Sequence, residues 1–441
     1  MSSGALGLLS LLAVVVGILT GFPMAFVFIF VGLLFGFIGV GAQVFHLLTY
    51  QFFSLMTSVD LSAIPLFLFM GYILEQSGLM DRMFTALQML LGRMKGSLYV
   101  IVIGTATLFA AATGIVGASV TVLGVMAAPL LIRSGYDTRM SAGCIAAGGT
   151  LGILIPPSIM LIVMGPLMGV PISDLFAAAV IPGLMLSAAF IIYTLVRCQI
   201  NPALGPAITD DRYAHLTLAQ KLRELLVGIV PITIVIVSTL GLIIAGITTP
   251  TDAAAAGSFA ALLLVVLYGR FTWARFKSAI LRTLVVNAFV MFLIGGANFF
   301  GAVFARLGGG QLVTQFLTSL SLPPTAMLLL MLLLIFALGG PLEWIPIVLV
   351  VVPILLPVAK SLGFDMMWFA ILIAVTLQTS WLTPPLALSS YFLKGVVPQW
   401  SMKDIYLGMT QFIGLQLAVI ALLIAFPGIV EWLPRAAGLI K

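Results

Sequence analysis

Residues Gly148 to Val163, GGTLGILIPPSIMLIV, place two consecutive prolines in the middle of an otherwise apolar stretch. Proline lacks a backbone N–H, and its ring pushes the preceding residue away from helical dihedral angles. As one continuous helix the segment 138–170 would run about 50 Å, which exceeds a hydrocarbon core of roughly 30 Å. The stretch therefore predicts a helix that tilts, kinks or unwinds at its prolines.

The composition assigns these apolar runs to a membrane. The chain has 441 residues, of which 62% are hydrophobic and 7% are charged. A soluble protein of this size cannot bury so much apolar surface, and a transmembrane barrel has alternating rather than continuous apolar sequence. We therefore expect an all-α polytopic membrane protein. Its N-terminus has no positive region and no cleavage site, which predicts a retained first span rather than a signal peptide.

The sequence also argues against several kinds of chemistry. Cys144 and Cys198 are lone cysteines in apolar surroundings, so neither a disulfide nor a metal cluster is expected. The two histidines, His46 and His215, are too few for bis-histidine haem or zinc chemistry. The chain contains no G-x-x-x-x-G-K-[ST] motif and therefore no P-loop for ATP hydrolysis. The net charge of +6 requires no nucleic acid as a partner.

The sequence resembles itself at an offset of 228 residues. The matching landmarks are Pro129 with Pro357, Gly135-Tyr136-Asp137 with Gly363-Phe364-Asp365, and Pro156-Pro157 with Pro384-Pro385. A double proline can arise once by chance, but several landmarks at one offset indicate an internal duplication.

The duplication predicts two halves of similar design. We expect inverted repeat 1 over residues 1–197, a polar cytoplasmic connector over 198–224 and inverted repeat 2 over 225–441. Each half is expected to contain scaffold helices, a re-entrant helical hairpin and a broken helix. The expected hairpins cover residues 97–132 and about 325–360, and the expected broken helices cover 138–170 and 366–397.

An odd number of crossings would turn the second half upside down relative to the first. We count five crossings in each half, the first three near 5–20, 24–42 and 61–77, and inverted repeats are typical of transporters. The basic loop Arg93–Lys95 precedes the first hairpin, whereas the matching place in the second half, SLSLPPT, has no charge. Because cytoplasmic loops collect Lys and Arg, this difference favours the inversion.

A break at membrane depth exposes backbone carbonyls that need partners. Such carbonyls are costly in hydrocarbon unless a bound cation or substrate satisfies them in a cavity. Carbonyl and hydroxyl oxygens suit an alkali cation, and the half-helix beginning at Ser158 directs a positive dipole end toward a carboxylate. A simple proline kink is the alternative, but two proline pairs at matched positions favour a binding site.

Polar residues also interrupt the tips of the two expected hairpins. The first tip reads AATGIVGASVTVLG over residues 111–124, and the second reads ALGGPLEWIPIV over 337–348. Within the second tip, Glu343 is the strongest candidate for a functional residue, because a carboxylate in apolar sequence costs free energy in the membrane and is usually functional. Pairing with a nearby base, or a position at an interface, is the alternative. Glu75 and Asp252 are weaker candidates near span ends.

The residues GASV at 117–120 match the G-x-S-x pattern of intramembrane serine proteases. The pattern is short, and only His46 lies near a span that could supply the histidine partner. The H-E-x-x-H motif of zinc proteases is absent as well. We therefore expect no enzymatic activity.

At these motifs the chain resembles the large membrane (permease) subunit of TRAP (tripartite ATP-independent periplasmic) transporters, over essentially its whole length. The segments that carry the resemblance are SGYDTRMSAGCIAAGGTLGILIPPSIML, ARLGGGQLVTQFLTSL and LIAVTLQTSWLTPPLALSSYFLKGV. The motifs ATGIVGAS and LQTSWLTPP most resemble those of the branch labelled mannitol/chloroaromatic compound transport, which also contains 2-oxoacid transporters.

The resemblance implies an elevator-type secondary transporter, similar to the ion transporter superfamily, in the cytoplasmic (inner) membrane of a bacterium or archaeon. Hairpins and broken helices would form a mobile transport domain beside a scaffold. A sodium gradient would drive import, with two or more Na⁺ per cycle. The implied partners, besides the lipid bilayer, are a small four-helix membrane subunit and a soluble periplasmic substrate-binding protein, each a separate polypeptide.

The resemblance also implies site residues, carried over by motif. One sodium site would be lined by Thr113, Gly114, Gly117, Ser119, Gly149, Thr150 and Pro156. The other would be lined by Gly340, Glu343, Thr379, Thr383 and Pro384. The substrate would lie between them, against Ser119, Pro157, Ser158, Glu343, Ser380 and Pro385.

The chain departs from the common family pattern at both sites. The first tip has TGIVGAS in place of a serine-rich S-G-S-S, and the second has Glu343 in place of an aspartate. Before the second proline pair, Gln378 and Ser380-Trp381 replace the usual Asn and Ile-Gly-Leu. These changes bear on the liganding atoms rather than on the architecture.

The leading functional hypothesis is sodium-coupled import of a small organic acid, a carboxylate that includes the 2-oxoacid type. The alternative within transport is a proton-coupled or binding-protein-independent organic anion transporter. A structural subunit of a respiratory complex is a third reading, but it would need charged residues along a proton path, and only Glu343 is a good candidate. The resemblance implies that the soluble binding protein, rather than this chain, does most of the substrate selection.

Overall fold

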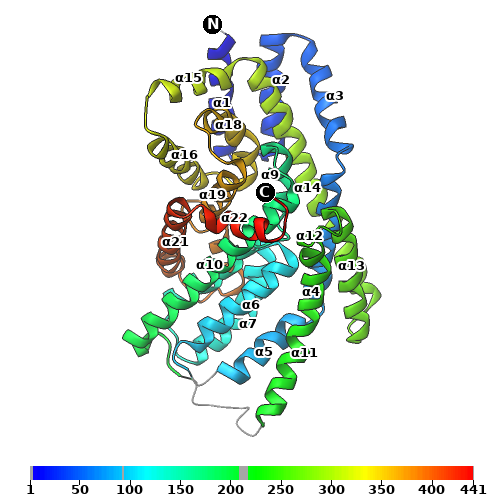
Figure 1. The fold of residues 1–441 in the computed structure, drawn as a ribbon, viewed down its shortest axis with the longest axis vertical. Helices are drawn as coiled ribbons and strands as arrows, with labels where there is room; N and C mark the ends of the chain where they lie inside the picture. Colours follow the sequence, from blue (N-terminus) through cyan, green and yellow to red (C-terminus); the bar gives the residue numbers. More distant parts are fainter. Residues whose placement is uncertain (1–2, 92–93, 208–216, 441) are drawn as a thin grey trace.

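We describe a computed structural model of the chain, which places residues 3–91, 94–207 and 217–440. Over these residues the regular elements are all helices, and no strand is present (Figure 1). Seven of the helices in this part are long and apolar enough to cross a membrane, or up to eight if one bent helix pair counts as a single span. The chain is thus an all-helical multi-pass membrane protein, as its composition predicts.

The first half consists of outer helices followed by a hairpin and a broken segment. The outer elements are α1 (Ser3–Leu19), α2 (Met24–Val40), α3 (Gln43–Met56), η1 (Asp60–Ser62), α4 (Ala63–Gln76) and α5 (Leu79–Leu91). The hairpin and broken segment are α6 (Ser97–Thr113), α7 (Val116–Arg133), α8 (Thr138–Thr150), η2 (Leu151–Ile153) and α9 (Ile159–Met168). The half ends with α10 (Ile172–Ile200) and the turn η3 (Pro202–Leu204).

The second half has the same order of elements. Its outer elements are α11 (Leu218–Ile236), η4 (Val237–Gly241), α12 (Leu242–Ile244), α13 (Pro250–Leu267), α14 (Trp273–Arg306) and α15 (Gly309–Ser319). The hairpin is α16 (Pro324–Gly339) followed by α17 (Trp344–Pro346), η5 (Ile347–Val351) and α18 (Val352–Ser361). The broken segment is α19 (Met366–Gln378), η6 (Thr379–Trp381) and α20 (Leu388–Val396), and α21 (Met402–Ala425) and α22 (Gly428–Ala436) complete the chain.

The offset of 228 residues relates the bounds of these elements. Adding 228 to the bounds of α8 gives those of α19, and the same shift carries η2 onto η6. It also carries α7, at 116–133, onto residues 344–361, which α17, η5 and α18 fill. The repeated landmarks in the sequence therefore correspond to repeated helix ends.

The matching starts of α8 and α19 have a local cause. The carboxylates of Asp137 and Asp365 each accept a hydrogen bond from the backbone amide three residues further on, at 2.8 Å and 2.7 Å. Each aspartate thus caps the first turn of its helix. Two residues earlier, Gly135 and Gly363 have φ of +69° and +73°, which glycine adopts without the penalty a side chain would bring. The repeated Gly-x-Asp motif is therefore a turn followed by a helix cap.

The structure differs from the expected bounds in two outer regions. Helix α3 was not among the expected crossings, and it joins the segment Asp60–Gln76 at a bend of 59°. Helix α10 runs on to Ile200 and α11 begins at Leu218, so both occupy part of the expected connector. Hydropathy did not indicate either extension, because local sequence sets both ends: α11 begins at a capping box of Thr217 and Gln220, and α10 ends just before Pro202. Residues 208–216 lie outside the described residues.

The broken segments are packed among helices from both halves. Helix α8 packs along α21, and α19 packs along α10 as well as α21. Gly143 and Gly408 lie at the crossing of α8 and α21, where an added Cβ on Gly143 would come within 2.5 Å of the Gly408 carbonyl oxygen. Small residues allow such close approach between membrane helices. Arg139 and Asp404 form an ion pair of 2.8 Å across the same crossing.

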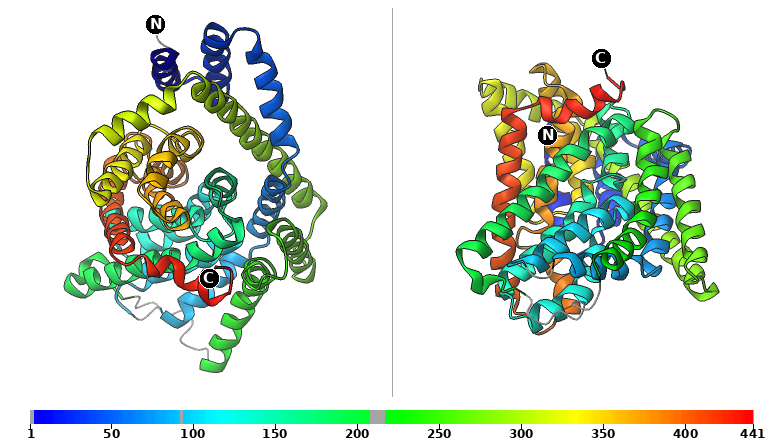
Figure 2. Two further views of the ribbon diagram at one scale, coloured as in Figure 1. Left: turned by 45° about the horizontal axis from the view of Figure 1, so that its top comes forward. Right: turned by 60° about the horizontal axis from the view of Figure 1, so that its bottom comes forward.

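Several of the outer helices lie to one side of this central group. Figure 2 shows α2, α3, α4, α13 and α14 along one side, with the hairpins and broken segments gathered beside them. Helix α14 packs against α2, α3 and α4, and α13 packs against α4. The central group contains all the proposed sodium and substrate residues, and the lateral group contains only the weaker candidates Glu75 and Asp252.

Candidate functional site

The first break is a short irregular segment between α8 and α9. Helix α8 ends at Thr150, a 3-10 turn follows, and the peptide bond between Pro156 and Pro157 is cis. Ser158 is extended, with φ of −121°, and its hydroxyl donates a hydrogen bond to the carbonyl of Ile153. Residues 149–158 are all buried. The first break is therefore closed off, and its hydroxyl groups bond to its own backbone.

The second break repeats this path with different surroundings. Helix α19 ends at Gln378, a 3-10 turn follows, and the peptide bond between Pro384 and Pro385 is cis. The Thr383 hydroxyl donates to the carbonyl of Thr379 at 2.8 Å. Both prolines are exposed, unlike the pair in the first break. The second break is therefore the more open of the two.

The tip of the first hairpin lies directly on the first break. Gly114, between α6 and α7, has φ of +63°, and an added Cβ would clash with the carbonyl oxygen of Pro157. An added Cβ on Gly149, at the end of α8, would clash with Val120 of the hairpin. Both glycines are required because backbone approaches backbone here. The first hairpin tip thus contacts both ends of the first break, at Gly149 and at Pro157; Gly114 and Gly149 were assigned to one sodium site and Pro157 to the substrate.

Hydroxyl groups near this first tip bond to their own helices. The Thr113 hydroxyl donates to the carbonyl of Phe109 at 2.9 Å, and the Ser119 hydroxyl donates to that of Ile115 at 2.7 Å. Each hydroxyl oxygen keeps lone pairs that can accept a further partner. Gly117 sits on the same turn as Ser119, and an added Cβ there would lie 2.9 Å from the ring of Phe392 in α20.

The tip of the second hairpin lies on the second break in the same manner. The amide of Leu386 donates to the carbonyl of Gly340 at 3.1 Å. An added Cβ on Gly340 would lie 3.2 Å from the carbonyl oxygen of Pro384, and one on Gly339 would lie 3.0 Å from the side chain of Ser380. The contacts therefore bring Gly340, Pro384 and Ser380 together in the second half.

Glu343 stands at the N-terminus of the short helix α17, at this second tip. Its side chain is partly buried, and no base or hydrogen-bond donor pairs with its carboxylate among the residues that the structure describes. Among the described residues, Glu343 is thus not paired with a base, contrary to the alternative considered from the sequence. Glu75, by contrast, lies 3.3 Å from Arg282, and Asp252 accepts a hydrogen bond from Thr249 at the start of α13.

The two breaks touch each other through one hydrogen bond. The side-chain amide of Gln378 donates to the Thr150 hydroxyl at 3.1 Å, and both residues are fully buried. They are separated by 228 residues, so they occupy the same position in the two halves. Sequence reasoning named Thr150 and noted that Gln378 departs from the family pattern, but it did not predict that the two would meet.

Buried polar atoms without a hydrogen-bond partner are concentrated at the second break. In the described part of the chain nine such side-chain atoms occur, and four of them belong to the second broken segment. They are Gln378 Oε1, Trp381 Nε1, Ser389 Oγ and Ser390 Oγ. Among those residues the first broken segment contributes none. Because such atoms cost free energy when unpaired, this side of the site is suited to a polar ligand.

Trp381, Ser389 and Ser390 were not among the predicted site residues. Trp381 stacks on Phe392 with ring centroids 6.4 Å apart and planes inclined by 23°. The serines are buried at the start of α20. Their signal in the sequence is the run LSSYF directly after the second proline pair, where two small hydroxyl residues begin a half-helix.

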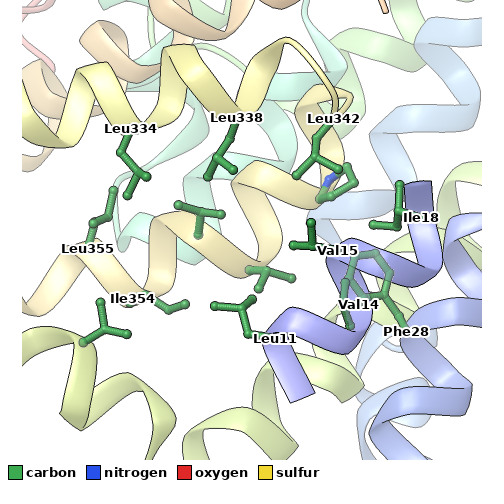
Figure 3. A pocket seen from close by; sticks show the side chains of 14 residues that line it. Leu11, Val14, Val15, Ile18, Phe28, Leu334, Leu338, Leu342, Ile354 and Leu355 are labelled. Carbon is green, nitrogen blue, oxygen red and sulfur yellow. The ribbon is translucent and has the colours of Figure 1, made fainter. Parts of the chain in front are cut away.

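An apolar cavity separates the second hairpin from the first two helices. Its volume is about 230 Å³, and Figure 3 shows Leu334, Leu338 and Leu342 facing Leu11 and Val14 across it. The remaining lining residues are aliphatic or aromatic, with Pro346 at the tip. Leu342 precedes Glu343, so the cavity reaches the polar tip. Loose apolar packing of this kind leaves the hairpin without hydrogen bonds to α1 and α2 at this contact.

The geometry offers oxygen ligands but no cluster of metal-binding side chains. Among the described residues, no group of three or more His, Cys, Asp or Glu side chains lies close enough to hold a metal ion. Backbone carbonyls and the hydroxyls of threonine and serine surround both breaks instead. Such hard, neutral oxygens suit an alkali cation better than a transition metal.

The chain matches one protein-family model and several known transporter proteins. The family model described as "Tripartite ATP-independent periplasmic transporter, DctM component" matches residues 11–429. A C4-dicarboxylate TRAP transporter large permease protein DctM from Rhodobacter capsulatus is 29% identical, over 88% of this chain and 90% of the relative. A sialic acid TRAP transporter large permease protein SiaM from Vibrio cholerae is 28% identical, over 94% and 95%.

Two further matches concern chain organisation and fold. An isethionate TRAP transporter permease protein DctMQ from Oleidesulfovibrio alaskensis is 27% identical over 86% of this chain, which spans 58% of that longer relative. The crystal structure of the Alcanivorax borkumensis YdaH transporter superposes with a TM-score of 0.62 at 17% identity, covering 88% of this chain and 89% of that one. The second match shows a shared fold.

These matches cover nearly the whole chain, including both breaks and both hairpin tips. They identify a transporter permease rather than an enzyme, and they place it in the inner membrane as a multi-pass protein. The chain belongs to the DctM-component family of tripartite ATP-independent periplasmic (TRAP) transporters, as their large permease subunit.

Proposed function

We propose that the chain imports a small organic acid by secondary transport, driven by a sodium gradient and fed by a periplasmic binding protein. The observation that carries this proposal is the pairing of each hairpin tip with the break of its own half. Gly114 lies on Pro157 in the first half, and Gly340 lies on Pro384 in the second. Each pairing gathers backbone and hydroxyl oxygens at a helix break, the environment that transporters use for sodium.

We propose the following sodium ligands, with no geometry beyond the contacts already given. One ion would be held around Thr113, Gly114, Gly117, Ser119, Gly149, Thr150 and Pro156. A second would be held around Gly340, Glu343, Thr379, Thr383 and Pro384. The substrate would lie between them, near Ser119, Pro157, Ser158, Glu343, Ser380 and Pro385.

The proposed movement is that of an elevator built from two inverted repeats. The hairpins and broken segments of both halves would move as one body, with the outer helices as scaffold. Contacts between the halves support a single body: α20 packs on α7, and Gln378 bonds to Thr150. The apolar cavity between the second hairpin and the helices α1 and α2 supports a sliding contact, because no polar bond there must break.

The proposed substrate is a carboxylate. The names of three relatives specify C4-dicarboxylates, sialic acid and 2,3-diketo-L-gulonate, each of which carries a carboxylate group, whereas the isethionate in the name of a fourth relative is a sulfonate. The unpaired donors at the second break, Trp381 Nε1 and the hydroxyls of Ser389 and Ser390, suit such an anion. Within the family we propose the branch labelled mannitol/chloroaromatic compound transport, and a 2-oxoacid as the finer substrate class.

The proposed partners are a small four-helix membrane subunit and a soluble binding protein. The DctMQ relative, which is longer than this chain, supports the first partner, because its name indicates two components in one polypeptide. Each partner would be a separate chain here.

Uptake into proteoliposomes tests the proposal. The substrate is identified first, by screening carboxylates for melting shifts of the binding protein encoded beside this chain. Labelled substrate is then supplied with that protein to vesicles containing this chain and the small subunit. We expect uptake only with an inward sodium gradient and only with the binding protein. Uptake without the binding protein would instead indicate a stand-alone anion transporter.

One observation favours a second candidate, proton coupling. Glu343 is a single carboxylate with no pairing base among the described residues, and such residues form proton relays in other transporters. The same vesicles decide between the two, since an inward proton gradient in sodium-free medium would drive uptake only in a proton-coupled protein.

A further inference from the structure

A hydrogen bond between Gln378 and Thr150 joins the two halves. The two residues occupy equivalent positions, 228 residues apart, and both are polar. Gln378 Nε2 lies 3.1 Å from Thr150 Oγ1, and both side chains are 0% exposed. Each residue is the last of its half-helix before the break, α19 or α8. The bond therefore connects the two points at which the helices stop.

The Thr150 hydroxyl is fixed on both sides by this bond. It donates to the carbonyl of Ala147 at 2.8 Å and accepts from Gln378. Rotation of the hydroxyl away from Gln378 would leave a buried amide without a partner, which is unfavourable in apolar surroundings. The orientation of one helix end is thus tied to that of the other.

The same amide has a free acceptor that no protein group occupies. Gln378 Oε1 is buried and has no hydrogen-bond partner in the described part of the chain. The residue next to it is Thr379, whose hydroxyl donates to the carbonyl of Thr376 at 2.6 Å. An ion or polar group near Thr379 would therefore interact with the side-chain amide of Gln378, which also holds Thr150.

We propose that Gln378 is a positioning residue that couples the two proposed sodium sites, so that an ion at one site raises affinity at the other. The inference rests on the proposed function, since Thr150 belongs to one sodium site and Thr379 to the other. An ion at the first site orders the end of α8. The hydrogen bond then orders the end of α19. The second ion therefore binds to a turn that is already ordered, and its binding costs less conformational entropy.

Coupling predicts cooperative sodium binding by the protein alone. Equilibrium binding of ²²Na⁺ to the purified full chain in lipid nanodiscs, with choline as the replacing cation, measures it without any substrate. For the natural sequence we expect a Hill coefficient between 1 and 2. For Gln378→Leu we expect a coefficient near 1 and a half-saturating sodium concentration raised by about fivefold or more, as for typical coupled sites.

The equivalence of the two positions provides a rescue variant. In the exchanged double variant Thr150→Gln/Gln378→Thr, the amide and the hydroxyl trade places across the two halves. We expect it to regain a Hill coefficient above that of Gln378→Leu, because donor and acceptor are again opposed. A residue needed only for folding would gain nothing from this exchange.

Gln416 provides the matched control. It is a glutamine of equal burial in α21, and neither of its side-chain polar atoms has a partner. We expect Gln416→Leu to leave the Hill coefficient unchanged. If Gln378→Leu does not fold, Gln378→Met removes the same donor with a more flexible side chain.

Each outcome bears on a different proposal. Absence of saturable sodium binding by the natural sequence would overturn the proposed sodium coupling itself. Saturable binding with a Hill coefficient of 1, or with the same coefficient in Gln378→Leu as in the natural sequence, would leave sodium coupling in place and overturn the role of Gln378.

Discussion

The two breaks have the same backbone path but opposite surroundings. Pro156 and Pro157 are buried, and Ser158 bonds back to its own segment, whereas Pro384 and Pro385 are exposed. Four buried polar atoms without partners belong to the second broken segment, and none among the described residues belongs to the first. The two copies of this duplicated element therefore differ. The first is buried and its polar groups bond to its own backbone, whereas the second is more exposed and has unpaired donors and acceptors.

This difference indicates separate tasks for the two copies. A segment whose polar groups are satisfied internally can hold its shape without a ligand. A segment with unpaired buried groups gains free energy when a polar ligand pairs with them. We therefore expect substitutions in the first break to affect folding most strongly, and those in the second break to affect ligand binding most strongly.

The largest expected effect comes from the two tip glycines. Gly114→Ala places a side chain at φ of +63° and against the carbonyl of Pro157. Left-handed backbone alone costs about 1–2 kcal/mol for a residue with a side chain, and the clash adds to it. We expect loss of uptake and a clearly lower thermal unfolding temperature in detergent.

Gly340→Ala is the matched change in the second half. Its backbone is not left-handed, with φ of −62°, and the added Cβ would lie 3.2 Å from the Pro384 carbonyl oxygen. We expect it to fold, with a smaller loss of uptake. Equal damage from both substitutions would contradict the idea that the first tip is packed more tightly.

Glu343→Gln is expected to have the next largest effect. The substitution removes the only carboxylate at either tip in the described residues, while its size is nearly unchanged. We expect uptake to fall by about tenfold, equivalent to about 1.4 kcal/mol, with normal protein level and unfolding temperature. Undiminished uptake would remove Glu343 from the mechanism.

The control for this substitution is Glu75→Gln. Glu75 is paired with Arg282 at 3.3 Å on the outer helix α4, so its loss should change stability slightly and leave uptake within about twofold of normal, as for most partly exposed ion pairs. A similar loss from both substitutions would indicate a general effect of charge.

Trp381→Phe sharpens the comparison at the second break. The substitution keeps a ring that can stack on Phe392 but removes the unpaired indole N–H. If that N–H meets a substrate oxygen, the KM for substrate should rise by about fivefold, since a hydrogen bond contributes about 1 kcal/mol. Ile153→Val, at the matching position of the first break, should leave the KM unchanged. An unaltered KM in Trp381→Phe would remove the indole from the substrate site.

The smallest expected effect concerns the helix caps, where the halves should behave alike. Asp137→Ala and Asp365→Ala each remove a carboxylate that caps its helix at 2.8 Å and 2.7 Å. Each should lower the free energy of unfolding by about 1 kcal/mol, measured as similar shifts in unfolding temperature. A large difference between them would mean that the asymmetry extends to the helix starts.

Much of the central architecture could be predicted from the sequence, because local chemistry determines it. The proline pairs mark the helix breaks, and Asp137 and Asp365 mark the helix starts at the same offset. The glycines at 114 and 340 mark the tips. These features depend on backbone dihedral angles and hydrogen bonds over a few residues, which the sequence expresses directly.

The remaining features depend on packing between distant segments. The bond between Thr150 and Gln378 joins residues that the offset equates but does not bring into contact. The unequal burial of the two proline pairs depends on what covers each one. Helix α3 was missed because its apolar pattern, QVFHLLTYQFFSLM, is weaker and ends at a bend of 59°.

Thiol labelling at matched positions tests the central claim most directly. Ser158→Cys and Leu386→Cys place one cysteine at the same point after each break, and the natural Cys144 and Cys198 are buried. We predict that a water-soluble maleimide labels Cys at 386 and not at 158, and that sodium in place of choline slows labelling at 386. Equal labelling at both positions, with no effect of sodium, would contradict the account.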